Sequence, residues 1–312
     1  MSRPTLQQLG YLVALADEGN FRRAAQACFV SQPALSTQIK ELERRLGATL
    51  IERTPRGALL TPAGRTAAAQ ARTVLQMVDD LAAAVDADGV ELTGAVDLGV
   101  IPTLAPYVLP TVVPVLTKRH PRAELRVREL RTEVLLDELA GGSLDVGLIA
   151  TSETPAGVVH QPLVPDPFLL ATSAADELAK GTGPVSLDAL TARPVLLLED
   201  GHCLRDQAQS VCDLVDARTR TIYDTSLATL VQMVAAGQGV TLLPTTAAAV
   251  EARPGNGIVT RRFDDPEPSR TIGLVWRGSS PRAAHYAELA ELLGPALAHR
   301  PQRPKTVRAA RA

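Results

Sequence analysis

The sequence predicts a mixed α/β protein in which a small helical domain precedes a larger domain of alternating strands and helices. Apolar residues recur at helical spacing through the first fifty positions, strand and helix patterns alternate from residue 94 to residue 300, and one long helical pattern joins the two regions. At 312 residues with 46% hydrophobic side chains, the chain has material for two or three domains. It contains no run of 18 apolar residues and no signal peptide, so we expect a cytoplasmic protein without a membrane partner.

The N-terminal region predicts three helices. Apolar residues repeat from Leu6 to Ala16, Asn20 can cap a short second helix over 21–27, and Ser31 can cap a third helix with Pro33 in its first turn. A short helix, a turn and a longer helix with a polar, basic outer face are typical of a helix-turn-helix, whose last helix enters the major groove of DNA. An ordinary three-helix domain with a solvated face stays open as the alternative.

A basic hairpin follows these helices. Two apolar stretches, 50–51 and 58–60, flank a segment with two arginines, which predicts a wing suited to phosphate or minor-groove contact and completes a winged helix-turn-helix over residues 1–60. Residues 1–65 carry nine Lys or Arg against five Asp or Glu, although the whole chain has a net charge of −2. The residues expected to contact double-stranded DNA are Arg22, Ser31, Gln32, Pro33, Ser36, Thr37, Lys40, Arg53 and Arg56.

Residues 61–89 predict a single long helix. Thr61 followed by Pro62 is a helix start, and apolar positions then alternate at four- and three-residue spacing until Asp88-Gly89. The apolar stripe is narrow and its side chains are small, which suits a helix paired with another helix better than one packed on a core. We interpret this segment as a dimerisation helix that links two domains, and a dimer fits two-fold DNA half-sites.

The region from residue 90 onward predicts a parallel sheet with helices. The expected strands are 96–100, 125–128, 146–149, 195–198, 240–243 and 272–276, with helices from about Ala105 and over 134–139. Sheets of this kind bind ligands at the carboxyl ends of their strands. Thr103 and Cys203 each follow an expected strand, so both are candidates for a site.

Two of the three cysteines, Cys203 and Cys212, lie nine positions apart after the turn signal Asp200-Gly201. A helix start at Cys203 would favour its thiolate, the oxidisable form, and His202 and Arg205 would add positive character. In one helix the two cysteines would be roughly 13 Å apart on opposite faces, whereas a disulfide needs Cα atoms within about 7 Å. A disulfide would therefore require the helix to unwind. Both cysteines as inert core residues remain the alternative. We expect Cys28 to be a core residue.

Other chemistries have little support in the sequence. Neither a GxxxxGK phosphate loop nor a GxSxG nucleophile elbow occurs, and the five histidines are scattered without metal-ligand spacing. We therefore expect no metal, no cofactor and no enzymatic activity. A thiol peroxidase is the competing enzyme class, and the predicted DNA-binding domain disfavours it.

The order of parts resembles that of the LysR-type transcriptional regulators. The resemblance rests on Phe21-Arg22-Arg23-Ala24-Ala25, Val30 to Ser36, Ile39, Leu42-Glu43, Leu46-Gly47 and Leu50-Ile51-Glu52-Arg53, and the order of parts continues it along the chain. The resemblance implies a winged helix that binds promoter DNA as dimers assembled into homotetramers and that acts with RNA polymerase. It also implies a regulatory domain of two lobes, like periplasmic binding proteins, with lobe I at 90–165 and 268–300 and lobe II at 166–267. Residues 301–312 are expected to be a disordered basic tail.

Within that family, the segment Leu198 to Gln207 with Cys212 is similar to the peroxide-sensing members. Their likeness implies control of antioxidant genes, with Cys203 as the peroxidatic thiol, Cys212 as the resolving thiol and a cellular thiol reductant that resets the disulfide. It also implies that peroxide is held, or the thiolate tuned, by Thr103, Thr132, His202, Asp206 and Arg270. Simpler roles stay open, namely a helix cap for Thr103, a surface ion pair for Arg270 and pairing with Arg205 for Asp206. A metabolite sensor of the same family is the alternative function.

Overall fold

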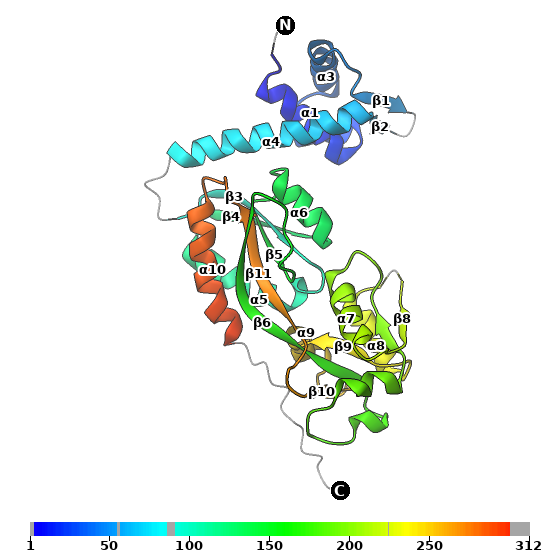
Figure 1. Ribbon diagram of the computed structural model, residues 1–312. Helices are drawn as coiled ribbons and strands as arrows, with labels where there is room; N and C mark the ends of the chain where they lie inside the picture. The colour runs from blue at the N-terminus through cyan, green and yellow to red at the C-terminus, as the bar shows by residue number, and fades with distance from the viewer. Residues whose placement is uncertain (1–2, 55–56, 86–90, 224, 300–312) are drawn as a thin grey trace. The chain divides into compact units, whose positions relative to one another are not determined.

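The computed structural model describes residues 3–54, 57–85, 91–223 and 225–299, which form two compact units (Figure 1). The expected basic tail at 301–312 lies outside the described residues. No helix of the described ranges is both long and apolar enough to span a membrane.

The N-terminal unit is a helix-turn-helix with an added hairpin. Three helices, α1 (Leu6–Glu18), α2 (Phe21–Ala27) and α3 (Gln32–Leu46), enclose an apolar core that includes Leu12, Leu35 and Ile39. Strands β1 (Ile51–Thr54) and β2 (Gly57–Leu60) pair in antiparallel fashion, and α4 (Pro62–Val85) follows. The structure confirms the predicted helix-turn-helix and hairpin.

The capping residues expected from the sequence begin the helices. Asn20 accepts the backbone N–H groups of Arg22 and Arg23, and Ser31 accepts that of Ala34 at 3.3 Å. Thr61 accepts the Gly64 N–H at 2.9 Å, which starts α4 at Pro62 as predicted. The helix ends at Val85 within the described residues, and the expected end near residues 88–89 lies outside them.

The C-terminal unit contains a seven-stranded mixed sheet. Its order is β10-β6-β11-β5-β3-β4, and β9 pairs with β6. The bounds are β3 (Gly94–Val100), β4 (Ala123–Glu129), β5 (Val146–Ile149), β6 (Val158–Ser173), β9 (Thr241–Pro244), β10 (Ile258–Arg262) and β11 (Ser269–Arg277). A separate parallel pair joins β7 (Val195–Leu197) and β8 (Thr219–Thr221).

Helices alternate with the strands along the chain of this unit. Their bounds are α5 (Ala105–Arg119), α6 (Thr132–Ala140), α7 (Cys203–Asp213), α8 (Leu227–Ala235), α9 (Thr245–Glu251) and α10 (Ala283–Ala298), with short 3₁₀ helices at Glu177–Ala179 and Leu187–Ala192. Helices α5, α6 and α7 each begin within about six residues of the end of a strand. This alternation confirms the predicted α/β class.

The prediction of a parallel sheet is only half right. Strands β3, β4 and β5 are parallel, but β11 runs antiparallel to both β5 and β6, and β9 and β10 are antiparallel to β6. The sequence reading also missed β6, which is 16 residues long. Pro162, Pro165 and Pro167 interrupt its pattern, and prolines in a run argue against a strand when only local sequence is considered.

Two apolar cores lie along β6 and β11, the paired strands that run side by side through the unit and connect the cores (Figure 1). The first core contains residues of β3, β5, α5, α10 and β11, and the second contains residues of β7, α7, α8 and β9. Strand β6 contributes Val164 to the first core and Phe168 to the second. The chain therefore passes from one core to the other between these two residues.

Candidate functional site

The first candidate surface is the outer side of α3 and the start of α2. Arg22, Ser31, Gln32, Pro33, Thr37 and Lys40 are exposed, and Ser36 is half-buried. Opposite them on α3, Leu35, Ile39 and Leu42 are buried in the core. Arg53 stands in β1 opposite Ala58, whereas Arg56 lies outside the described residues. An amphipathic helix that presents small polar groups and a lysine to solvent can lie in the major groove of DNA.

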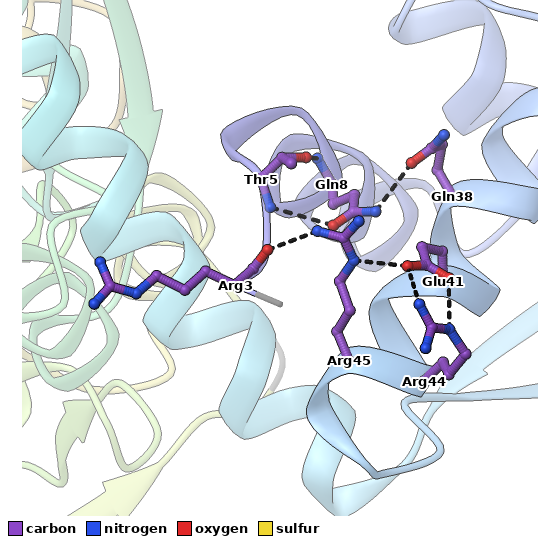
Figure 2. Close-up of polar contacts among 7 residues, drawn as sticks. All are labelled: Arg3, Thr5, Gln8, Gln38, Glu41, Arg44 and Arg45. Atoms are coloured by element: carbon purple, nitrogen blue, oxygen red, sulfur yellow. Dashed lines mark hydrogen bonds and ion pairs between the residues drawn. The ribbon is translucent and has the colours of Figure 1, made fainter. Parts of the chain in front are cut away.

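A polar network ties one side of α3 to the start of α1 (Figure 2). The buried side chain of Gln8 accepts the Thr5 N–H at 3.2 Å and donates to the Gln38 side chain of α3 at 3.0 Å. About two turns further along α3, Arg45 donates to the Arg3 carbonyl at 2.6 Å. The capping box of α1 therefore also fixes the orientation of α3 about its own axis.

Glu41 completes this network between two arginines. It accepts from Arg44 at 2.6 and 2.7 Å and from Arg45 at 2.8 Å. The hydrogen bonds from Arg44 and then Arg45 lower the pKa of Glu41 to about 2, so its carboxylate stays ionised at any physiological pH. Because Arg44 is already paired with Glu41, which it shares with Arg45, Lys40 is the better candidate for a phosphate contact.

The second candidate site lies at the carboxyl edge of the parallel strands. Strands β5, β3 and β4 are neighbours, so the residues that follow them meet at one edge of the sheet. Ala150 follows β5, Thr103 follows β3 and Thr132 follows β4. Helix α7 starts against this edge, because Cys203 packs on the first core and Gln207 donates to the Ala150 carbonyl. The structure thus brings Cys203 to the same edge as both threonines.

Helix α7 holds the two cysteines in different surroundings. Cys203 is its first residue and is half-buried against the first core, whereas Cys212 is fully buried in the second core. Nine helical steps separate them by roughly 13 Å, so the predicted single helix is confirmed and the thiols are out of bonding range. Burial and then the charge of Asp213 raise the pKa of Cys212 to about 11, which keeps it a neutral thiol.

The charges near Cys203 differ from the expectation. Burial lowers the pKa of His202, and the nearby positive charge of Arg131 lowers it further, so His202 is neutral at pH 7. The prediction of positive character from His202 was therefore wrong. Arg205 lies 3.0 Å from the Asp200 carboxylate and 3.3 Å from that of Asp206, so its charge is matched. The positive end of the α7 dipole remains as the feature of positive character beside Cys203.

Thr103 and Arg270 are buried together. The guanidinium donates to the Thr103 hydroxyl and to the Thr103 carbonyl, each at 3.3 Å. Its third nitrogen, Nε, donates to Asp166 at 3.0 Å. Thr103 is not the cap of α5, whose cap position is Leu104, and Arg270 forms a buried rather than a surface ion pair. Both simpler roles left open by the sequence are therefore excluded.

The remaining expected residues occupy different environments. The Thr132 hydroxyl is buried and has no hydrogen-bond partner among the described residues. Asp206 is exposed and pairs with Arg205, which is the simpler of its two expected roles. Gln207 was not among the residues expected at the site, but its side-chain oxygen is also buried without a partner in the described part of the chain. The spacing in the sequence could have indicated Gln207, because residues four apart lie on the same face of a helix and Gln207 is four residues after Cys203.

Comparisons with known proteins identify related domains in both units of the chain. Residues 6–65 match the bacterial regulatory helix-turn-helix of the lysR family, and residues 90–298 match the LysR substrate binding domain. A protein of Streptomyces viridosporus named as a probable hydrogen peroxide-inducible genes activator is 46% identical over 96% of this chain and 97% of its own length. The chain belongs to the LysR family of DNA-binding regulators. Within that family the chain is similar to OxyR proteins, whose solved structures match its fold.

Two solved structures extend this similarity to the fold. A full-length OxyR variant from Pseudomonas aeruginosa has a TM-score of 0.79 and 34% identity, over 94% of this chain and 95% of that one. A mutant OxyR from Corynebacterium glutamicum with hydrogen peroxide bound has a TM-score of 0.65 and 36% identity, over 95% of this chain and 94% of that one. The LysR family is one of transcriptional regulators rather than enzymes, as expected from the sequence.

Proposed function

We propose that this protein is a transcriptional regulator that senses hydrogen peroxide through a reversible bond between Cys203 and Cys212. The observation that carries the proposal is the geometry of α7, which starts with an accessible cysteine at the sheet edge and ends with a sequestered one. The peroxide-bound relative and the peroxide-inducible activator support it. Such a helix converts a chemical event at one end into a structural change along its length.

The reaction has two balanced steps. The Cys203 thiolate attacks one oxygen of hydrogen peroxide, the O–O bond breaks, and the hydroxide that leaves takes up a proton to become water. The resulting sulfenic acid then condenses with the Cys212 thiol, which forms the disulfide and releases a second water. The second step requires α7 to unwind, because the helix holds the sulfurs apart.

We assign peroxide binding to the groups at the sheet edge. The Thr132 hydroxyl can donate and accept hydrogen bonds, and the Gln207 side-chain carbonyl can accept one. Bound hydrogen peroxide would therefore give both of these buried groups a hydrogen-bond partner. The Thr103 hydroxyl would contribute a further donor, and His202, as a neutral imidazole, a donor or acceptor. Arg270 would act through Thr103, and Asp206 through Arg205, because each is committed to that partner.

The N-terminal unit would deliver the signal to DNA. We propose that α3 reads promoter operators, with Ser36, Thr37 and Gln32 at the bases and Lys40, Arg53 and Arg56 at phosphates. The small-sided α4 would form the dimer, and two dimers would form a tetramer that activates antioxidant genes together with RNA polymerase in the cytoplasm. The domain boundaries expected from the sequence belong to this proposal, as does a cellular thiol reductant that restores the two thiols.

Mass spectrometry of the α7 peptide tests the sensing step. The reduced full-length protein is treated with one equivalent of hydrogen peroxide, and unreacted thiols are alkylated before digestion. We expect Cys203 and Cys212 to lose labelling together, while Cys28 remains labelled. Persistent labelling of both would favour the alternative, a regulator that binds a small metabolite between its lobes and has structural cysteines.

A salt series tests the DNA-binding surface. Each phosphate contact that is lost reduces the slope of log affinity against log salt by about one. We expect Lys40→Ala to produce this change on operator DNA and Arg44→Ala to produce less, because Glu41 already matches Arg44. Equal effects of the two substitutions would contradict the assignment of Lys40.

A further inference from the structure

The buried ion pair between Asp166 and Arg270 joins the paired strands β6 and β11. The two residues stand opposite each other in the antiparallel register of β6 and β11, their side chains have no exposed area, and their charged atoms are 3.0 Å apart. A buried ion pair is rarely worth more to stability than apolar side chains of the same size. Its presence between the two cores therefore calls for a role in positioning.

The pair distributes its hydrogen bonds to both sides. Asp166 accepts from the Thr246 backbone N–H at 2.9 Å and from the Thr246 hydroxyl at 2.8 Å, at the start of α9. Arg270 donates with its other two nitrogens to Thr103, at the carboxyl end of β3. A continuous chain of hydrogen bonds thus runs from α9 through both charged groups to the proposed peroxide site.

A second contact connects α9 to the segment that follows β3. Tyr107, one turn after Thr103, donates its hydroxyl to Glu251 of α9 at 2.8 Å. Burial raises the pKa of Tyr107, and the bond to Glu251 raises it further, so the hydroxyl remains a donor at physiological pH. Helix α9 is therefore fixed at its first turn by Asp166 and at its last residue by Tyr107, which limits the freedom of Asp166 to rotate.

The donation from Arg270 decides what Thr103 can offer. A hydroxyl has one proton and two lone pairs. Because Arg270 donates to one lone pair and cannot accept a hydrogen bond, the hydroxyl proton must point to another acceptor. At the sheet edge that acceptor would be a peroxide oxygen. The direction of the Thr103 proton thus depends on where the Arg270 guanidinium is held.

We infer that Asp166 is a positioning residue for peroxide reduction, which acts by holding Arg270 against Thr103. This inference rests on the proposed function. Thr246 anchors Asp166, and Asp166 fixes the position of the Arg270 guanidinium. The guanidinium orients the Thr103 hydroxyl, which donates a hydrogen bond to the peroxide oxygen that leaves when the Cys203 thiolate attacks. Asp166 itself does not contact the peroxide.

The test compares two reactions of the same thiol in the reduced full-length protein. Hydrogen peroxide requires an oriented donor for its leaving oxygen, whereas alkylation by iodoacetamide reports only the access and the ionisation of Cys203. Both rates are followed on the Cys203 peptide by mass spectrometry. Thr246→Val removes one hydrogen bond to Asp166 and leaves both buried charges in place. Thr241→Val is the control, because Thr241 also donates its hydroxyl at 2.8 Å, to the Leu196 carbonyl, although Thr241 is buried and Thr246 is half-buried.

We expect Thr246→Val to lower the peroxide rate by about tenfold with an unchanged alkylation rate, which is less than the roughly hundredfold loss from a 1 Å misplacement of a catalytic group. Thr246→Ser, which keeps the hydroxyl, should restore the rate, and Thr241→Val should leave it unchanged. Asp166→Asn should lower the rate further. If that variant does not fold because it leaves the charge of Arg270 unmatched, Thr246→Val decides.

Three outcomes would overturn the inference. An unchanged peroxide rate in Thr246→Val would show that the anchoring of Asp166 does not affect the proposed peroxide site. An equal fall of the peroxide and alkylation rates would show that Asp166 only maintains the structure. Failure of the wild-type protein to oxidise Cys203 with dilute peroxide would instead refute the proposed function, and this inference with it.

Discussion

The two ends of α7 differ in nearly every property that governs a thiol. At its first turn, Cys203 is half-buried and stands at the positive end of the helix dipole. At its last turn, Cys212 has no exposed area, and its pKa is raised to about 11. The same helix therefore presents one thiol for reaction and protects the other.

The packing of α7 explains this division. Leu204, Ala208, Val211 and Cys212 form its buried stripe in the second core, while Cys203 packs on the first core. The last turn is held by apolar contacts, and the turn before Cys203 is held by polar contacts from Arg131 to Glu199 and to the Asp200 carbonyl. The reactive thiol and the protected thiol are therefore held by different cores. Formation of a disulfide must detach one end of α7 from its core.

Cys203→Ser should have the largest effect. Removal of the Cys203 thiol leaves only the buried Cys212 on α7, so both the oxidation of this helix and the promoter response should be lost. Labelling of Cys212 after peroxide treatment measures this directly. A disulfide or a promoter response that persists in the variant would show that the first turn of α7 is not the reactive end.

Cys212→Ala should separate the two chemical steps. Oxidation of Cys203 should proceed at the wild-type rate but stop at a sulfenic acid, which a dimedone probe detects. The loss of a buried sulfur should also lower the free energy of unfolding by about 1–2 kcal/mol. A change in stability close to zero would mean that the last turn is not held by the second core.

Alkaline pH should reveal the raised pKa of Cys212. In the unfolded chain a cysteine ionises near pH 8.5, but the folded protein keeps Cys212 protonated until about pH 11. The stability from this burial is therefore complete below about pH 8.5 and is lost as pH rises towards 11, at about 1.4 kcal/mol per pH unit. Urea unfolding at several pH values should show this slope in the wild type relative to Cys212→Ala, and equal slopes would contradict it.

Arg131→Gln should give the smallest effect. Arg131 is about half exposed and holds the turn that precedes Cys203 through Glu199, so the loss of this pair should release the turn. An exposed pair of this kind is worth about 0.2–1 kcal/mol, which predicts disulfide formation that is faster by up to about fivefold. Arg128→Gln is the control, because its partner Glu138 lies on α6. Identical rates in the two variants would show that the turn does not limit unwinding.

The local sequence was sufficient for most of the architecture. Caps such as Asn20, Ser31 and Thr61 and the apolar repeats of α3 depend on residues within one or two turns, so the helix-turn-helix and α7 could be read directly. The spacing of Cys203 and Cys212 likewise predicted that one helix would separate them. These features depend on a period and on hydrogen bonds between near neighbours, which the order of residues alone defines.

The tertiary structure decided what lies between distant segments. Strand β6, interrupted by prolines, becomes visible only through its pairing with β11, and that register places Asp166 opposite Arg270. The loss of charge at His202 and the burial of the Gln207 carbonyl also result from elements far away in the chain. Desolvation and ion pairing depend on distance in space rather than on order in sequence. The sequence by itself therefore determined that a thiol stands at a helix start, and the fold determined which groups surround it.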